Sequence, residues 1–264
     1  MSIKIKDIDI CSQCGNKDCS YTNAEIKANF FGVRTEETVC PNAVLIDGPL
    51  DKVKNSILVD QNCINCGLCA INCHSNNIDC DNLDFFNDDF KDLNRLQYNA
   101  IVCSYLNRIF GFSANTNRNK SLQFDGYVCT INGKEAFVQI DYNNDSLECA
   151  RRLIGDFLLF SPSDRKIQNG IIVLNDFPRK GSNDIYNVLQ AIMEFPTTYN
   201  FKFYFTTFKL LRFLALNINT AENLDFDDLL IDLTSDSSFH NLYLLLKKKM
   251  PDNIQVIRML LGFL

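Results

Sequence analysis

The sequence predicts a chain in two parts: a small cysteine-rich α+β domain over residues 1–80, then an α/β domain over residues 81–264 that has a mixed sheet and a helical tail. Three observations lead to this prediction. Eight of the twelve cysteines fall between Cys11 and Cys73. The composition turns acidic directly after Cys80. Beyond that point, segments with helical periodicity alternate with strand-like apolar runs, a pattern typical of a sheet covered by helices.

Length and charge limit the possible functions. A chain of 264 residues is long enough for one large domain or two ordinary ones. No apolar run reaches the roughly 18 residues that a membrane span requires, and the first residues lack the apolar core of a signal peptide. We therefore expect a cytoplasmic protein with no membrane partner. The formal net charge of −6 argues against extensive non-specific binding to nucleic acid, although a local basic groove remains compatible with it.

The most informative motif is "CINCGLCAINC" at residues 63–73, which contains Cys63, Cys66, Cys69 and Cys73. Thiolates are soft ligands that suit zinc or iron–sulfur clusters. Zinc ribbons use two separated C-x-x-C pairs. The spacing C-x2-C-x2-C-x3-C instead places three sulfurs of one short loop at three corners of a [4Fe–4S] cluster, and the fourth cysteine ligates the other cluster in two-cluster ferredoxins. A second set of ligands is therefore expected.

An upstream set exists, in "CSQCGNKDC" and "VCPNAVLIDG", which supply Cys11, Cys14, Cys19 and Cys40. Over residues 3–79 the chain resembles a bacterial-type dicluster ferredoxin. The resemblance implies two [4Fe–4S] clusters with crossed ligation: one held by Cys11, Cys14, Cys19 and Cys73, the other by Cys63, Cys66, Cys69 and Cys40. It also implies short strands at residues 41–48 and 55–62. A single cluster and a zinc site are the alternatives.

The chain departs from the ferredoxin pattern in three places. The first cysteine run is C-x2-C-x4-C, two residues wider than usual in that family. About twenty residues separate Cys19 from Cys40 and contain a predicted short helix near residues 22–32. His74 stands where the family usually has proline. These changes weaken the first predicted cluster more than the second.

The second domain is predicted from periodicity. Apolar residues at helical spacing predict a helix over residues 93–111, and the polar stretch at 113–121 is expected to be a loop. Strands are expected at 122–131 and 134–142, joined by the hairpin signal "NGK". Further elements then alternate: helix 144–160, strand 170–176, helix 183–195 and strand 201–208. Leucine and phenylalanine at helical spacing predict helices over residues 208–264, where "KKK" is expected at a solvated helix end.

This order resembles the PD-(D/E)XK restriction-endonuclease-like fold over residues 90–210. In that family an acidic residue in one strand and a D/E-x-K motif in the next hold a divalent metal and activate water. The resemblance implies Asp125 as the first acid and aligns Gln139, Ile140 and Asp141 with D/E-x-K. Gln139 is at best a neutral ligand and Asp141 cannot replace the lysine, so a divalent metal is expected to bind weakly. Ordinary polar strand residues are the alternative interpretation of Asp125 and Asp141.

Three functions are consistent with these features. We expect an iron–sulfur protein whose nuclease-like domain is inactive and docks a protein partner or a nucleic acid in a multi-component system, such as a DNA-acting or defence system. The first alternative is a ferredoxin-type electron carrier whose second domain selects a redox partner. The second alternative is an active metal-dependent nuclease with structural clusters. The sequence contains no GxxxxGK[ST] or GxGxxG, so no nucleotide site is expected.

Overall fold

The structure is a computed structural model that describes residues 2–7, 10, 66–73, 75–81, 85–86, 95–115, 124–142, 146–160, 167–177, 201–218, 224–232 and 237–262. The chain divides into two compact units, Met1–Ser104 and Tyr105–Leu264, with the boundary inside helix α5 (Arg95–Phe110). The sequence analysis had placed this boundary after Cys80. The strands expected at 41–48 and 55–62, and the helices expected near 22–32 and at 183–195, lie outside the described residues.

The described part of the first unit is centred on a two-stranded antiparallel sheet. Strand β1 (Ser2–Ile5) pairs with β2 (Ile78–Asp81), so the start of the chain runs beside the segment that follows the second cysteine run. The single-turn helix α4 (Leu68–Ile71) lies within that run. The sheet therefore holds together two segments that are far apart in the sequence.

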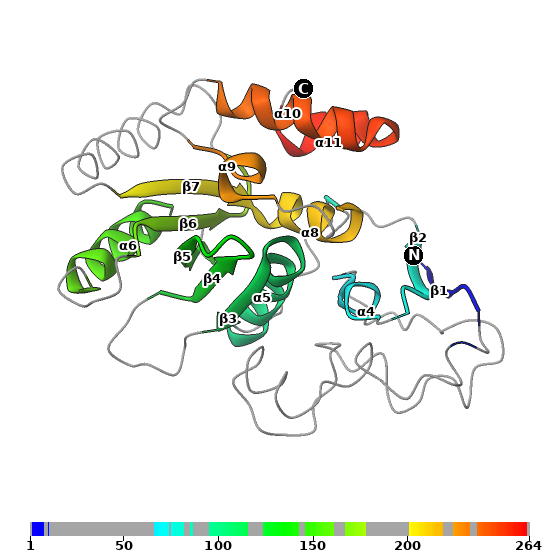
Figure 1. Ribbon diagram of the computed structural model, residues 1–264, viewed down its shortest axis with the longest axis horizontal. Coiled ribbons are helices and arrows are strands. Elements are labelled where there is room, and N and C mark those ends of the chain that lie inside the picture. The colour runs from blue at the N-terminus through cyan, green and yellow to red at the C-terminus, as the bar shows by residue number, and fades with distance from the viewer. Residues whose placement is uncertain are drawn as a thin grey trace. The chain divides into compact units, whose positions relative to one another are not determined.

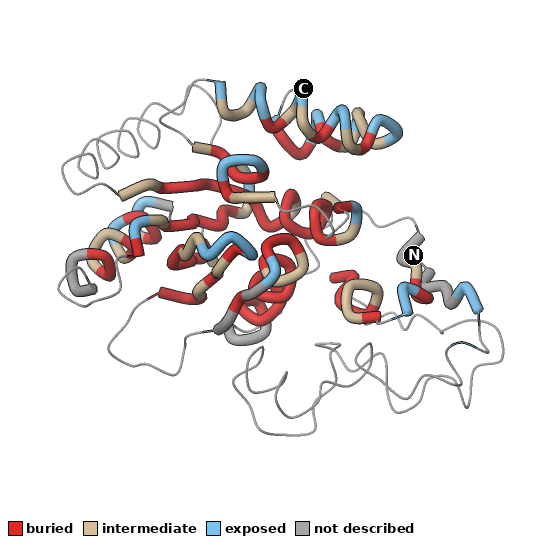
Figure 2. The backbone as a smooth tube through the Cα atoms, viewed as in Figure 1, coloured by how far each residue is buried: buried red, intermediate tan, exposed pale blue. Residues whose placement is uncertain are grey.

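The second unit contains a five-stranded sheet, which confirms the prediction of a mixed α/β sheet. Its strands are adjacent in chain order: β3 (Gly111–Asn115), β4 (Gly126–Thr130), β5 (Glu135–Ile140), β6 (Asn169–Leu174) and β7 (Lys202–Thr207). The first three form an antiparallel meander, and β5, β6 and β7 are parallel (Figure 1). The parallel strands are buried along nearly their whole length (Figure 2), as expected for strands covered on both faces.

Helix α6 (Ser146–Phe160) covers one face of the sheet. Leu153 and Phe157 on α6 pack into a core with side chains that alternate along the parallel strands, namely Phe137, Ile172, Leu174, Phe203 and Phe205. Alternate strand residues point to opposite faces, so Tyr204 points away from α6. Its ring lies 5.7 Å from that of Phe226, the first residue of α9 (Phe226–Leu229), which identifies the second covered face.

Further helices contribute to that second face and to the tail. The ring of Tyr105 on α5 lies 5.5 Å from that of Phe208, the first residue of α8 (Phe208–Asn217). The chain then continues through α10 (Ser238–Lys249), a 3-10 turn (Pro251–Asn253) and α11 (Ile254–Leu260). Within the part of the chain that the structure describes, none of the helices combines the length and apolar character of a membrane span.

One predicted element is corrected. Residues 113–115 belong to strand β3 and not to the expected loop. Gly111 has φ of 103°, a left-handed conformation that ends α5 and turns the chain directly into the strand. Ser113 is buried and pairs with Val128 across the ladder. Only Phe112 and Ala114 alternate with polar residues here, and the polar run that follows them gives the whole stretch the composition of a loop.

Candidate functional site

The described cysteines of the second run lie along α4: Cys66 precedes the helix, Cys69 lies within it and Cys73 follows it. Gly67 precedes the helix with φ of 73°, a left-handed conformation that turns the chain between Cys66 and Cys69. Cys66, Cys69 and Cys73 are all buried, and none of them forms a disulfide. Buried cysteines at this spacing, outside any disulfide, have the chemistry of an iron–sulfur ligand set.

Hydrogen-bonding groups lie beside the sulfur of Cys73. Asn76 adopts φ of 51°, and its backbone amide donates to the carbonyl oxygen of Cys73 at 3.0 Å. This turn directs the backbone amide of Asn77 to the Cys73 sulfur at 3.2 Å. The hydroxyl of Ser75 lies 3.6 Å from the same sulfur. Ligand sulfurs of iron–sulfur clusters commonly accept hydrogen bonds from nearby backbone amides, so the position of this cysteine fits the role of a cluster ligand.

The other predicted ligands, Cys11, Cys14, Cys19, Cys40 and Cys63, lie outside the described residues, as does His74. One predicted ligand set therefore retains Cys66 and Cys69, and the other retains Cys73. Among the residues that the structure describes, no three histidine, cysteine or carboxylate side chains gather into a metal-binding group. Since no predicted set has more than two described members, this observation does not bear on the crossed arrangement.

The predicted acids of the second unit lie at one end of the β4–β5 pair. Asp125 immediately precedes β4, and its backbone amide donates to Val138 at 2.9 Å. Its carboxylate accepts the backbone amide of Ile140, also at 2.9 Å. Asp141 immediately follows β5 and continues the pairing with β6, because its amide donates to Val173 at 2.9 Å. Both acids thus form hydrogen bonds that hold the strands together at this end of the sheet.

Gln139 faces α6. Its side-chain amide nitrogen lies 3.4 Å from a carboxylate oxygen of Asp156, which is a fully buried acid on that helix. The sequence analysis missed Asp156. A signal was present, since Asp156 follows the buried residues Cys149 and Leu153 by seven and three positions, which places it on the same helix face. A charged residue on an apolar helix stripe is a candidate polar site.

These three acids and Gln139 are all buried away from solvent. Asp125 and Gln139 have 0% exposure, Asp156 has 1% and Asp141 has 3%. A hydrolytic metal site needs ligands that both metal and substrate can reach, with open coordination positions for water. The arrangement is therefore suited to fixing the β4–β5 end and to packing α6, and the Asp125 carboxylate already has a structural acceptor role.

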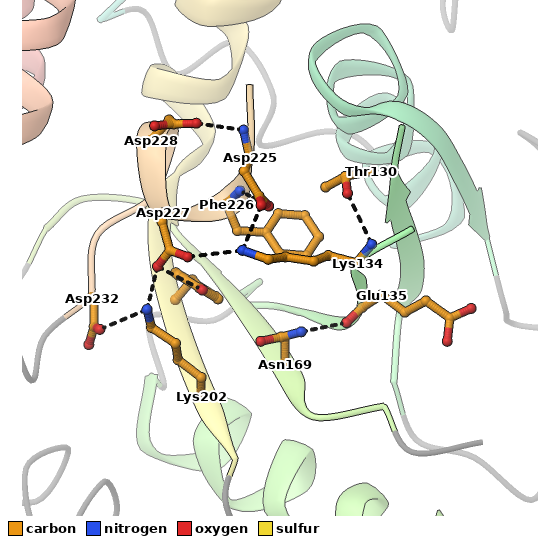
Figure 3. Close-up of polar contacts among 11 residues, drawn as sticks. Thr130, Lys134, Glu135, Asn169, Lys202, Asp225, Phe226, Asp227, Asp228 and Asp232 are labelled. Atoms are coloured by element: carbon orange, nitrogen blue, oxygen red, sulfur yellow. Dashed lines mark hydrogen bonds and ion pairs between the residues drawn. The ribbon is translucent and has the colours of Figure 1, made fainter. Parts of the chain in front are cut away.

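Lys134, the lysine nearest to the predicted motif, is engaged elsewhere. It lies at the opposite end of β5 from Asp141, about 20 Å away at the usual rise of a strand. Its ammonium group contacts Asp225 at 2.6 Å and Asp227 at 3.1 Å. Figure 3 shows it pointing into this acidic group. It therefore cannot replace the missing lysine of the nuclease motif.

The acidic group around Lys134 fastens α9 to the amino ends of β5 and β7. Asp227 also pairs with Lys202 on β7 (Figure 3). It accepts a hydrogen bond from the hydroxyl of Tyr204 at 3.0 Å. Asp225 caps α9 in a reciprocal capping box with Asp228. Beyond the helix, Phe205 and Ile231 exchange two backbone hydrogen bonds, at 2.7 and 2.9 Å. We call these contacts the α9 clamp.

The charges of the clamp shift one another's pKa. The hydrogen bond to Asp225 raises the pKa of Lys134 above its usual value. Burial opposes ionisation of Asp227, but hydrogen bonds from Lys202, Lys134 and Tyr204 outweigh it and lower the pKa of that carboxyl. Burial, reinforced by the Asp227 carboxylate, raises the pKa of Tyr204. None of these shifts prepares a nucleophile or base for neutral pH, so the clamp is structural.

Comparisons of the chain with protein-family models, with curated proteins and with solved structures found no match. The ferredoxin and nuclease resemblances therefore rest on the residues quoted above.

Proposed function

We propose that this chain is an iron–sulfur protein holding two [4Fe–4S] clusters, joined to a nuclease-like domain that binds a nucleic acid or a protein partner and does not cut. The observation that carries the proposal is the second cysteine run. Its three described members are buried beside α4 and form no disulfide, and a backbone amide donates to the Cys73 sulfur. This environment suits cluster ligands, and the spacing matches a dicluster ferredoxin.

Two features support a binding role for the second domain. The order of helix, antiparallel strands, helix and parallel strand agrees with the order on which the nuclease resemblance rests. The acids at the corresponding positions are buried, and Asp125 is committed to the backbone of Ile140. Since no lysine stands at Asp141, water activation lacks its usual cation. We therefore propose a partner-binding domain that has a nuclease-like fold and lacks the residues needed for metal-dependent hydrolysis.

Metal analysis tests the clusters. Anaerobically purified protein is expected to contain about eight irons and eight acid-labile sulfides per chain, as two such clusters require. Stoichiometric zinc without sulfide would contradict the proposal. Cys40→Ser is expected to affect the cluster assigned to Cys63, Cys66 and Cys69, whereas Cys14→Ser is expected to affect the other. Loss of the same spectral signal in both variants would contradict the crossed ligation.

A cleavage assay tests the second domain. Holo-protein is incubated with Mg²⁺ or Mn²⁺ and with single- and double-stranded DNA and RNA, and we expect no robust hydrolysis. The matched variants are Asp125→Asn, which keeps an acceptor for Ile140, and Asp141→Asn. Cleavage that both variants abolish would establish an active nuclease. Gel-shift measurements on the same substrates show whether the chain binds nucleic acid.

The acidic charge favours electron transfer as a second candidate function. A net charge of −6 suits docking on a basic redox partner. Reduction of a partner oxidoreductase by dithionite-reduced holo-protein, without any binding of nucleic acid, would support this candidate over the first.

A further inference from the structure

We propose that Asn77 is a positioning residue that joins the two chain segments supplying ligands to one cluster. The inference rests on the proposed function, in which Cys73 and Cys11 belong to the same ligand set. Asn77 is buried at 3% exposure, and it contacts both segments at once. Its backbone amide donates to the Cys73 sulfur. Its side chain forms hydrogen bonds with Asp7, in the segment that leads to Cys11.

The backbone contact depends on the turn before it. Asn76 has φ of 51°, the one positive φ of a non-glycine residue among those that the structure describes. The turn brings the amide of Asn77 to the Cys73 sulfur at 3.2 Å. Lys6 fixes the same turn from the other segment, since its ammonium group donates to the carbonyl oxygen of Asn76 at 3.0 Å and pairs with Asp79 at 2.9 Å.

The side-chain contact is a reciprocal pair of hydrogen bonds. The Asn77 Nδ2 group donates to the carbonyl oxygen of Asp7 at 2.5 Å, and the amide of Asp7 donates to Asn77 Oδ1 at 2.9 Å. The amide of Lys6 adds a bond to the carbonyl oxygen of Asn77 at 2.9 Å. Asp7 precedes Cys11 by four residues in the sequence, so these bonds fasten the segment that leads to this cysteine to the segment that carries Cys73.

These contacts have a consequence for the proposed cluster. A hydrogen bond to a ligand sulfur stabilises the more negative, reduced state and so raises the reduction potential. The hydrogen bonds of the Asn77 side chain hold the two ligand segments together, which should slow the loss of that cluster. The two effects can be separated, because the turn at Asn76 controls the first and the side chain of Asn77 controls the second.

The turn is tested at position 76 with a matched pair. Asn76→Gly and Asn76→Ala both remove the side chain, but glycine adopts a positive φ without strain and alanine does not. Potentials are measured by reductive titration of holo-protein followed by electron paramagnetic resonance. We expect Asn76→Ala to shift the reduction equilibrium of one cluster at least tenfold toward the oxidised form, about 59 mV for one electron, and Asn76→Gly to match the wild type.

The side-chain contact of Asn77 is tested with Asn77→Ala, and Asn72→Ala is the control. The Asn72 side chain donates to Leu68 at 2.8 Å within the α4 turn and does not join the two segments. On exposure to air, Asn77→Ala should lose half of its iron several-fold faster than the wild type and keep the other half at the wild-type rate. Asn72→Ala should follow the wild type.

Three outcomes would overturn the inference. Both clusters could respond equally, Asn76→Gly could shift the potential as much as Asn76→Ala, or Asn77→Ala could behave as the wild type. In each case a wild-type chain with its full iron and sulfide leaves the proposed function standing. A wild-type chain without sulfide removes the proposed function and this inference together.

Discussion

Gly170 on β6 lies against two core side chains of helix α6. A Cβ atom built there would lie 2.5 Å from Leu153, 2.9 Å from Phe203 and 3.0 Å from Phe157. No separation below about 3 Å is tolerated without movement, and these neighbours are themselves buried core residues. The glycine is therefore required for space, and its loss would force α6 away from the sheet.

We predict that Gly170→Ala destabilises the protein by about 1–3 kcal/mol, the usual cost of overpacking a dense core. The measurement is the urea midpoint of the holo-protein, with unfolding followed by circular dichroism. Gly155→Ala is the control, since Gly155 lies on α6 between Leu153 and Phe157 but a Cβ there meets no atom within 4 Å. It should stabilise the protein by up to about 1 kcal/mol, because alanine favours a helix interior. Equal effects at the two positions would contradict this explanation.

At the scale of elements, the α9 clamp provides a local test of electrostatics. Asp227 has a lowered pKa, so its contribution to stability is present above the ordinary carboxyl range and is lost as pH falls through the lowered value. Lys134 and Lys202 have raised pKa values, so their contributions are present below the ordinary lysine pKa and are lost as pH rises through the raised values. The clamp is therefore strongest between these limits.

We predict that Asp227→Asn lowers the urea midpoint at pH 7 and reduces its fall between pH 6 and pH 3. Asp176→Asn is the control, because Asp176 pairs with Lys209 at 2.9 Å but is 74% exposed, and exposed ion pairs contribute little. The clamp is itself only partly buried, so added salt should weaken its contribution. If Asp227→Asn keeps the full acid sensitivity of the wild type, the clamp does not stabilise α9.

The elements that could be predicted from the sequence are those that bury an apolar stripe. The helix expected at 93–111 and the strands around Phe137 and Ile172 have such stripes, and the structure contains them. Strand β3 offers only Phe112 and Ala114 before a polar run, so its pairing with β4 could not be predicted from the sequence. The α9 clamp could not be predicted either, since it joins Lys134 to Asp227 over 93 residues and depends on the strand order.

The candidate sites also differ in how far the sequence alone predicts them. Ligand spacing is local, so the cysteine run could be identified from the sequence. The burial of Asp125 and the role of Asn77 depend on which segments meet, and no local pattern records that. Asp156 is intermediate, because helical spacing indicates its buried face but not its contact with Gln139.

At the scale of the whole molecule, the two parts of the chain differ in what can stabilise them. The sheet of the second unit is held by a core of large apolar side chains between α6 and the parallel strands. Residues 8–80 contain nine of the twelve cysteines and a lower share of large apolar residues than residues 81–264. Where ligands replace a core, binding of the metal supplies free energy of folding. We therefore expect the proposed clusters to stabilise the N-terminal part of the chain alone.

We predict that chelation or air oxidation makes residues 8–80 sensitive to protease while the second unit stays resistant. The measurement is limited proteolysis of holo- and cluster-depleted protein, with fragments identified by mass spectrometry. Cleavage should begin within residues 8–80 after cluster loss, because the ligands no longer hold those segments. Gly170→Ala should do the reverse, loosening residues 105–264 while the iron is retained. Unchanged cleavage within residues 8–80 after full iron loss would show that this part folds without its clusters.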